Sequence, residues 1–431
     1  MMLTEGERRW VSRRLHFIGI GGAGMSGLAL VCHDLGAIVT GSDRADSTYM
    51  ERLRAGELYP VVGHNAANVE DGFEVVVSTA IDEENPELVR ARELGLEIHR
   101  RGAILAELCE EKRLIAVAGT HGKTTTSAML TWALRWLGAD PSFFVGGEVP
   151  GLAYGGGVAN AGWGMGEWVV AEADESDASF LELEPEIAVI TNIEMDHHAR
   201  WGSTAELREA FDRFAAGARL AEFDLDSPGP AELELAVPGR HNVLNARAAL
   251  AAAELAGFDL DEAAKALAAF PGVHRRLEFK GEHEGATIYD DYAHHPTEVA
   301  ATLEALRELG PRRLIAVFQP HLYSRTKALA EQFGAALALA DEAIVLDVYP
   351  AREEPVGELA GVSGLDVARA AADRMGGRPV VWAPSPEQAR AALESRLSAG
   401  AILVTVGAGD VFRVGEALLE DAGNSTEARE R

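Results

Sequence analysis

The fold is decided by Leu114-Ile-Ala-Val-Ala-Gly-Thr-His-Gly-Lys-Thr-Thr-Thr-Ser127, which joins an apolar run, a tight turn and a helical segment. The apolar residues 114–118 predict a buried parallel strand, and residues 124–137 predict a helix. A turn between a strand and a helix directs backbone N–H groups and a helix N-terminus toward an anion. The stretch therefore predicts a phosphate-binding loop.

The residue types in this turn suit a nucleoside triphosphate. The two glycines would let the backbone approach phosphate oxygens, Lys123 would reach the β- and γ-phosphates, and Thr124 would offer a hydroxyl to Mg²⁺. The glycines are closer together than in the usual P-loop, where four residues separate them. An ordinary glycine turn with a surface lysine is the alternative, but the strand–loop–helix context disfavours it. We predict an ATP site formed by Gly119, Thr120, His121, Gly122, Lys123, Thr124 and Thr125.

The composition is typical of a large α/β protein. The chain has 431 residues with 47% apolar residues, 45 glycines and only 6% aromatic residues, and such a length normally forms about two to four domains. The formal net charge of −29 argues against nucleic acid or an anionic membrane as a partner. Cys32 and Cys109 lack metal-binding spacing, which favours a reducing cytoplasm. No apolar run approaches the ~20 residues of a membrane helix, and residues 1–14 do not form a secretory signal.

A second glycine-rich turn lies near the N-terminus. It falls between a strand predicted at residues 15–20 and a helix predicted at 25–35, and its glycines match the GxGxxG pattern. The next strand, at 37–40, leads to Asp43, about where an acidic residue would meet a ribose hydroxyl. The motif indicates NAD, although a nucleotide-sugar diphosphate would satisfy the same amides. The predicted ligand-binding residues are Gly19, Gly21, Gly22, Gly24, Ser42 and Asp43.

Acidic residues follow another apolar strand, which begins at Trp168. Its carboxyl end carries Glu172, Asp174, Glu175 and Asp177. Carboxylates beside a phosphate loop suit Mg²⁺, which takes few protein ligands and keeps phosphates and waters. The strand predicted at 187–191 brings Asp196 and His197 to the same edge of the sheet. A solvated acidic loop is the alternative. Residues 146–166, which precede this strand, are expected to form a glycine-rich loop.

An alanine-rich helix opens at Arg240-His-Asn-Val-Leu-Asn245. Asn242 and Asn245 share one helical face, where their amides could read an adenine edge, or Asn242 could cap the helix. Beyond residue 271, strands are expected at 286–290, 314–318, 343–348, 380–383 and 402–406, with helices between them. The first two strands lead into segments rich in histidine, at the edge where α/β sheets bind ligands.

The predicted fold class is therefore α/β with three domains. The first, residues 1–110, is Rossmann-like, and the second, residues 111–270, is P-loop ATPase-like. The third, residues 271–431, is a doubly wound, Rossmann-like domain without a phosphate loop of its own.

Six segments together resemble the Mur ligase family, in order from about residue 15 to about residue 420. They are Gly19-Ile-Gly-Gly-Ala-Gly-Met-Ser-Gly27, Gly119-Thr-His-Gly-Lys-Thr-Thr-Thr126, Glu172-Ala-Asp-Glu-Ser-Asp177, Arg240-His-Asn-Val-Leu-Asn245, Asp290-Asp-Tyr-Ala-His-His-Pro296 and Gln319-Pro-His-Leu-Tyr-Ser-Arg-Thr326. The resemblance implies ATP-dependent ligation of L-alanine to the lactyl carboxylate of UDP-N-acetylmuramate. The carboxylate would attack the γ-phosphate to give an acyl phosphate and ADP, and the amine would then attack the acyl carbon. The first domain would hold the UDP moiety.

The resemblance also implies roles for single residues. Thr124 and Glu172 would hold the Mg²⁺ of Mg-ATP, and His197 would support a second ion. Asn242 and Asn245 would face the adenine.

The third domain would supply the remaining contacts. By the same resemblance, Arg276 and Asp291 would close on ATP, and His294 and Arg325 would lie near the alanine and the acyl centre. The implied catalytic residues are Lys123, His197, His294 and Arg325.

The sequence departs from the family pattern in three places. His198-Ala199 stands where the family has an apolar residue and an aspartate, so the last carboxylate is absent. Residues 198–238 form a shorter segment than usual, and Leu322 replaces a common arginine.

Three other functions remain open at this level: a related ligase that recycles murein peptide, an NAD-dependent oxidoreductase, and a non-catalytic nucleotide-binding regulator. We expect a cytoplasmic monomer or weak homodimer.

Overall fold

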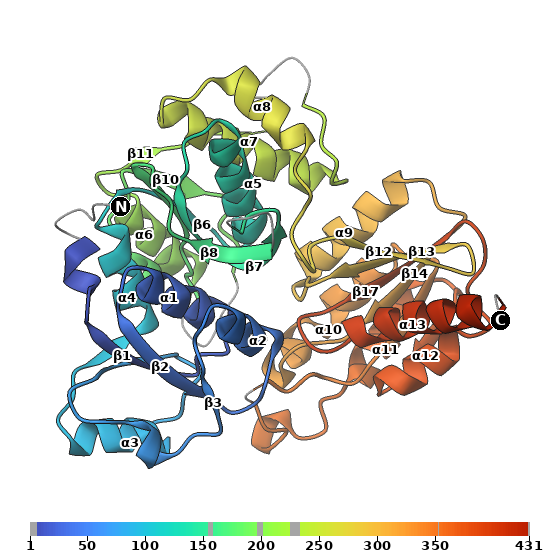
Figure 1. Cartoon of the computed structure of the whole chain (residues 1–431). Coiled ribbons are helices and arrows are strands. Elements are labelled where there is room, and N and C mark those ends of the chain that lie inside the picture. The colour runs from blue at the N-terminus through green and yellow to red at the C-terminus, as the bar shows by residue number, and fades with distance from the viewer. Residues whose placement is uncertain (1–6, 154–157, 196–200, 225–232, 352, 430–431) are drawn as a thin grey trace. The chain divides into compact units, whose positions relative to one another are not determined.

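The structure is a computed structural model that describes residues 7–153, 158–195, 201–224, 233–351 and 353–429 (Figure 1). The chain divides into two units: Met1–Ala236 with Val243–Pro271, and Val237–Asn242 with Gly272–Arg431. Two sheets belong to the first unit and one to the second. The predicted α/β fold class with three sheet-based domains is confirmed, while the boundaries at residues 110 and 270 stay predictions. Within the described ranges, every helix is too short or too polar to cross a membrane.

The first sheet is fully parallel, with the strand order β3-β2-β1-β4-β5. Its elements are β1 (Arg14–Ile18), α1 (Ala23–Asp34), β2 (Ile38–Asp43), α2 (Thr48–Ala55), β3 (Val61–Val62), β4 (Glu74–Val77), α3 (Pro86–Glu93), β5 (Ile98–Arg100) and α4 (Arg101–Cys109), with short 3₁₀ turns η1 (Glu7–Trp10) and η2 (Ala66–Asn68). Because side chains alternate along a strand, Leu15 and Phe17 of β1 join the apolar core of α1 and α4, whereas Ile18 packs with Leu88 of α3. Helices therefore cover both faces, as a Rossmann-like sheet requires.

The second sheet has the order β11-β10-β6-β9-β7-β8. Its elements are β6 (Arg113–Ala118), α5 (Lys123–Trp136), β7 (Ser142–Pro150), β8 (Val158–Gly162), β9 (Trp168–Glu172), η3 (Ser179–Glu182), β10 (Ile187–Ile190), α6 (Thr204–Phe214), β11 (Arg219–Leu220), α7 (Arg240–Leu255) and α8 (Leu260–Ala268). Strand β6 pairs in parallel with β9 and β10. The predicted strand and helix around the phosphate loop are thus both present, and the acidic strand end lies next to them.

Part of the segment 146–166, which we expected to be a glycine-rich loop, forms strands instead. It contributes to β7 and β8, which pair antiparallel at the sheet edge, with an irregularity between Phe144 and Val149. A Cβ on Gly146 would lie 2.5 Å from the carboxylate oxygens of Glu172. The glycine here permits close approach of the strand to a neighbouring side chain, which is a known use of glycine in sheets.

The two sheets of the first unit share one apolar core. Leu28 of α1, Ala116 of β6 and Phe211 of α6 belong to the same cluster of buried residues. The Asn160 side chain of β8 donates a hydrogen bond to the carbonyl oxygen of Ala23, over 2.8 Å. Burial of a continuous apolar surface stabilises the pair of sheets together, which explains why they form one unit.

The third sheet has the order β12-β13-β17-β14-β15-β16 and is parallel except for β12. Its elements are β12 (Glu278–His283), β13 (Ala286–Asp291), α9 (Pro296–Glu308), β14 (Arg313–Phe318), α10 (Tyr323–Leu337), β15 (Glu342–Val345), η4 (Gly357–Leu359), α11 (Gly364–Arg374), β16 (Val380–Trp382), α12 (Pro386–Leu393), β17 (Ala401–Val406) and α13 (Phe412–Arg429). Leu314 of β14 packs in the core that includes α9, α10 and α11, and Ile315 packs in the core that includes α12 and α13. The doubly wound prediction is confirmed; β12 is an additional strand.

A buried polar network fills the α3 side of the first sheet. The carboxylate of Glu87, at the start of α3, is fully buried and lies 3.5 Å from His16 Nε2. It accepts hydrogen bonds from Ser42 Oγ at 2.5 Å, Asn68 Nδ2 at 2.6 Å and the Asn65 amide at 3.1 Å. Burial alone would raise the pKa of Glu87, but these hydrogen bonds outweigh it and lower the pKa to about 2.

Glu87→Gln is expected to destabilise the first unit by about 3 kcal/mol at pH 7, because one pKa unit corresponds to about 1.4 kcal/mol. A depressed carboxyl pKa contributes stability above the unfolded value near 4.5, and this stability is lost as the pH falls toward 2. Urea unfolding at pH 7 and at pH 3.5 measures both effects, and the variant's deficit should shrink at the lower pH. Glu93→Gln, on the exposed side of the same helix, is the matched control; an equal deficit for both variants would contradict the network's role.

Candidate active site

The phosphate loop owes its shape to two glycines with left-handed backbone angles. Gly119, directly after β6, has φ +126°, and Gly122 has φ +82°. Gly122 is the N-cap of α5, and having no side chain it cannot cap the first turn of the helix. A helix N-terminus with uncapped amides favours an anion. This geometry suits a phosphate group.

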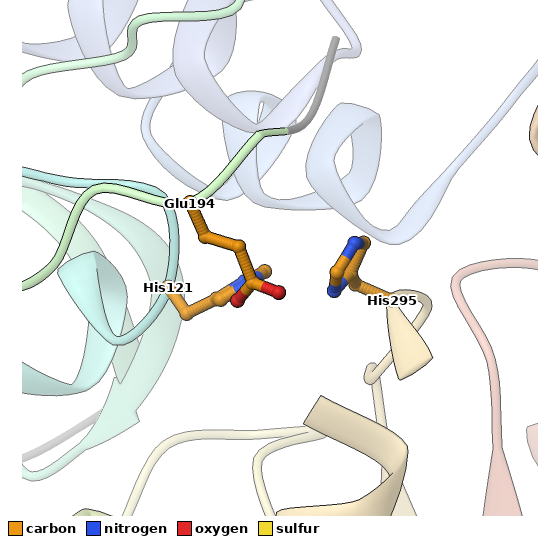
Figure 2. A group of neighbouring side chains, drawn as sticks. All are labelled: His121, Glu194 and His295. Atoms are coloured by element: carbon orange, nitrogen blue, oxygen red, sulfur yellow. The ribbon is translucent and has the colours of Figure 1, made fainter. Parts of the chain in front are cut away.

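The loop is fastened to the segment that follows β10. The Asn192 side chain accepts a hydrogen bond from the His121 amide at 3.0 Å and donates one to the His121 carbonyl at 2.9 Å. Thr120 Oγ donates to the Glu194 carbonyl, and the His121 ring lies 3.1 Å from the Glu194 carboxylate (Figure 2). These paired contacts fix the loop backbone. The third residue labelled in Figure 2, His295, belongs to the second unit and is the N-cap of α9.

Lys123 is folded over its own loop. Its ammonium group donates to the carbonyls of Gly119 at 2.7 Å and Thr120 at 3.2 Å, and to the Glu175 carboxylate at 2.7 Å. Burial alone would lower the pKa of Lys123, but the carboxylates of Glu175 and its neighbours raise it, so the side chain stays charged. Burial raises the pKa of Glu175 to about 7 against the attraction of Lys123.

Two of the predicted metal ligands lie together. Thr124 Oγ donates a hydrogen bond to Glu172 Oε1 at 3.2 Å, and Glu172 Oε2 accepts one from the Gly146 amide at 2.7 Å. A hydroxyl and a carboxylate oxygen at this spacing are hard ligands that fit Mg²⁺, which needs only a few protein oxygens. Asp196 and His197, predicted beside them, lie outside the described residues.

The N-terminal glycine turn is also formed, and Asp43 closes it. Gly19 has φ +83°, and the Gly21 amide donates to the Asp43 carboxylate at 2.9 Å. Arg101 lies beside Gly24: its Cδ atom is 3.4 Å from the place that a Cβ on Gly24 would occupy. Ser42 is fully buried, and its hydroxyl donates a hydrogen bond to Glu87, so its side chain has a structural role in the first sheet. Contacts of this turn with a ligand stay predictions.

The two asparagines of α7 have different surroundings. Asn245 belongs to the first unit, where its Oδ1 accepts from Thr126 Oγ at 3.4 Å and lies 2.4 Å from the position of a Cβ on Gly122. Asn242 belongs to the second unit and donates from Nδ2 to the Pro238 carbonyl at 2.7 Å. The capping interpretation of Asn242 is wrong, because α7 begins at Arg240 and Asn242 lies inside the helix.

In the second unit, the end of β13 is held by Asp291. Its carboxylate accepts hydrogen bonds from the amides of Leu277 and Ala293, both at 2.7 Å. Burial raises the pKa of Asp291 to about 6, while Arg276 opposes the shift. The Arg276 guanidinium also lies 5.1 Å from the centre of the Tyr292 ring. The segment that carries Arg276 is thus held against the end of β13 by Asp291.

His294 and Arg325 lie in a second cluster of this unit, joined through His321. The His294 and His321 rings meet edge to face at 5.9 Å, and Arg325 lies 3.4 Å from His321 Nδ1. His294 Nδ1 is 3.1 Å from the Tyr292 carbonyl, so a proton on Nδ1 leaves Nε2 as the basic nitrogen. Burial lowers the pKa of His294 to about 4, so the ring is neutral at pH 7.

Comparison with known proteins decides the family. Residues 14–113 match the model of the Mur ligase family catalytic domain, 117–223 the Mur ligase middle domain, and 275–409 the Mur ligase glutamate ligase domain. The UDP-N-acetylmuramate–L-alanine ligase of Mycolicibacterium vanbaalenii is 42% identical over 472 aligned positions, covering 95% of this chain and 96% of that protein. The chain belongs to the Mur ligase family. The enzyme of the same name from Streptomyces coelicolor is 43% identical, covering 95% and 97%.

Solved structures of Mur ligases share the fold. UDP-N-acetylmuramate–alanine ligase from Thermotoga maritima is 29% identical, covers 96% of this chain and 99% of that chain, and has a TM-score of 0.81. A murein peptide ligase from Psychrobacter arcticus is 25% identical, covers 96% and 99%, and has a TM-score of 0.67. The 472-position alignment is longer than this chain of 431 residues, so the Mycolicibacterium relative has segments without a counterpart in this Mur ligase.

The sequence analysis gave no role to several residues of this Mur ligase site. Asn192 and Glu194 hold the loop, and Arg101 lies 3.7 Å from Asp177. His321 was in a quoted motif and also had no role. Glu175, which we had grouped with the carboxylates suited to Mg²⁺, pairs with Lys123. These contacts join segments that are far apart in the sequence, so the spacing of residues along the chain could not predict them.

Proposed function

We propose that this Mur ligase couples ATP cleavage to the joining of L-alanine and the lactyl carboxylate of UDP-N-acetylmuramate, through an acyl phosphate, in cytoplasmic peptidoglycan precursor synthesis. The relatives that are 42–43% identical over nearly the whole chain carry this name. The observation that carries the proposal in this chain is the phosphate loop, in which Lys123, Thr124 and Glu172 converge.

Both reactants of the first step are anions, so neutralisation of charge is the main task of the protein. Lys123 would bind the β- and γ-phosphates, and the loop amides after Gly119 would hold their oxygens. Thr124 and Glu172 would hold Mg²⁺, which when bound supplies further positive charge to the phosphates. The fastening of the loop by Asn192 supports this assignment, because preorganised donors need no rearrangement during reaction.

The second step requires an uncharged amine. His294, which is neutral at pH 7, would accept a hydrogen bond from the alanine amine through Nε2, and Arg325 would hold an anionic oxygen. Asn245, which lies beside Gly122, supports placing adenine near the start of α7. We assign Asn242, Arg276 and Asp291 to the nucleotide and His197 to a second ion on the family resemblance.

Release of ADP tests the reaction. The intact protein is incubated with Mg-ATP, UDP-N-acetylmuramate and one amine: L-alanine, L-serine, glycine or a murein tripeptide. We expect ADP release that needs the UDP-sugar and is fastest with L-alanine. Faster release with the tripeptide would favour a recycling ligase, and ATP binding without any release would indicate a non-catalytic regulator.

The N-terminal glycine turn is expected to bind UDP-N-acetylmuramate and not NAD. The start of α1, which has no side-chain cap, offers the same donors to either diphosphate, but only the UDP-sugar is a substrate of the proposed ligation. Calorimetric titration of the intact protein with each ligand distinguishes them, with UDP alone as a control. Tight binding of NAD and none of the UDP-sugar would favour an oxidoreductase.

A further inference from the structure

The acidic side chain nearest to the catalytic lysine has no role in the ligation described above. The Lys123 ammonium carries three N–H bonds, and three acceptors surround it: two loop carbonyls and Glu175 Oε2. The two side chains are little exposed, at 12% for Lys123 and 1% for Glu175. A phosphate oxygen therefore reaches this ammonium only by replacing one of the three acceptors.

Glu175 is held in place independently of Lys123. Its carbonyl oxygen accepts hydrogen bonds from the Ala178 amide at 3.2 Å and from the indole nitrogen of Trp201 at 3.1 Å. Trp201 is itself buried against Phe180, with ring centres 6.5 Å apart. The backbone of Glu175 is thus anchored in an apolar cluster and cannot follow the lysine toward a ligand.

The three acceptors of Lys123 are not equally replaceable. The carbonyls of Gly119 and Thr120 belong to the loop itself, and losing them would disturb the backbone that binds phosphate. Glu175 is a separate group that is anionic above its pKa of about 7, so a phosphate group can take over its charge interaction with the ammonium. Its carboxylate would then remain buried with one strong partner fewer, which costs free energy in a poorly hydrated place.

We propose that Glu175 is a positioning residue that competes with nucleotide phosphate for the Lys123 ammonium and so sets the affinity of the site for ATP and ADP. Without nucleotide, Glu175 holds the Lys123 ammonium over the loop. When nucleotide binds, the ammonium leaves Glu175 for the phosphates, and it returns to Glu175 as ADP leaves. Nucleotide therefore binds more weakly, and ADP leaves faster, than if Lys123 had no carboxylate partner. This inference rests on the proposed function, because it needs a nucleotide at the loop.

Calorimetry with Mg-ADP on the intact protein tests the competition. Glu175→Gln keeps the size of the side chain but removes its charge, and we expect it to bind Mg-ADP about tenfold more tightly, the effect of losing one competing charge. The KM for ATP should fall with it, and kcat should not rise. Glu184→Gln removes one exposed negative charge from the same unit and should leave the Kd unchanged.

A double-mutant cycle separates this role from a structural one. In a Lys123→Gln background, Glu175→Gln should no longer tighten Mg-ADP binding. Should Glu175→Gln fail to fold, Glu175→Asp is measured instead, and its shorter side chain should give a two- to threefold tightening, about a third of the full effect. Weaker or unchanged binding in the single variants, or equal tightening in the Lys123→Gln background, would overturn the proposal. Absence of nucleotide binding by the wild-type protein would instead overturn the proposed function.

Discussion

Lys123→Ala is expected to lower kcat/KM for ATP-dependent ligation by about 10³-fold or more, because a charge aimed at a transferring phosphoryl group contributes several kcal/mol to the transition state. The side chain is at the phosphate loop, with its ammonium 2.7 Å from the Gly119 carbonyl. Release of ADP in the presence of UDP-N-acetylmuramate and L-alanine measures the loss. Lys265→Ala, which removes an exposed lysine of α8, is the matched control and should retain activity.

The interpretation of this variant depends on stability. Lys123→Ala leaves the Glu175 carboxylate buried without its cation, and breaking a buried ion pair costs about 3–5 kcal/mol. The double variant Lys123→Met/Glu175→Gln removes both charges and should recover most of that stability. It should be as inactive as the single variant. Substantial ligation by a folded double variant would show that Lys123 does not bind the transferring phosphate.

The elements around the phosphate loop could be predicted because local sequence determines them. An apolar run followed by glycines and a lysine specifies a buried strand, a turn and a helix, and β6 and α5 follow within one residue of the expected positions. The same holds for the doubly wound third sheet, where strands and helices alternate. Glycine misled us at residue 146, because there it serves close packing against Glu172 in strand β7 and not a turn.

The pairing of polar side chains could not be predicted in this way. Lys123 looked like a loop lysine in the sequence, but in the structure it is nearly buried against Glu175, 52 residues away. Asp43, which we predict to meet a ribose, also accepts a hydrogen bond from Gly21 in the glycine turn, a contact that the sequence did not indicate. Such contacts depend on which strands become neighbours in the sheet, and that order is a property of the whole fold.

Gly119→Ala is expected to destabilise the first unit by about 3 kcal/mol and to lower kcat/KM about 10²-fold or more. Gly119 has φ +126°, which alanine rarely adopts. Its added Cβ would lie 2.1 Å from Thr191 Oγ and 2.9 Å from the Thr191 amide, so the loop must move away from the segment that fastens it. Urea unfolding measures the first effect, and ADP release with saturating UDP-N-acetylmuramate and L-alanine measures the second.

Gly138→Ala separates backbone strain from the clash at the loop. Gly138 also has a left-handed φ, +77°, but a Cβ there meets no atom within 4 Å. Its substitution should therefore cost only the strain of an alanine in that conformation, about 1–2 kcal/mol, and leave kcat/KM within about twofold of the wild type, as surface changes away from a site usually do. If both variants lost activity equally, global destabilisation would explain the result. If Gly119→Ala kept full activity, the loop would not be the phosphate site, because its backbone could shift without consequence for the reaction.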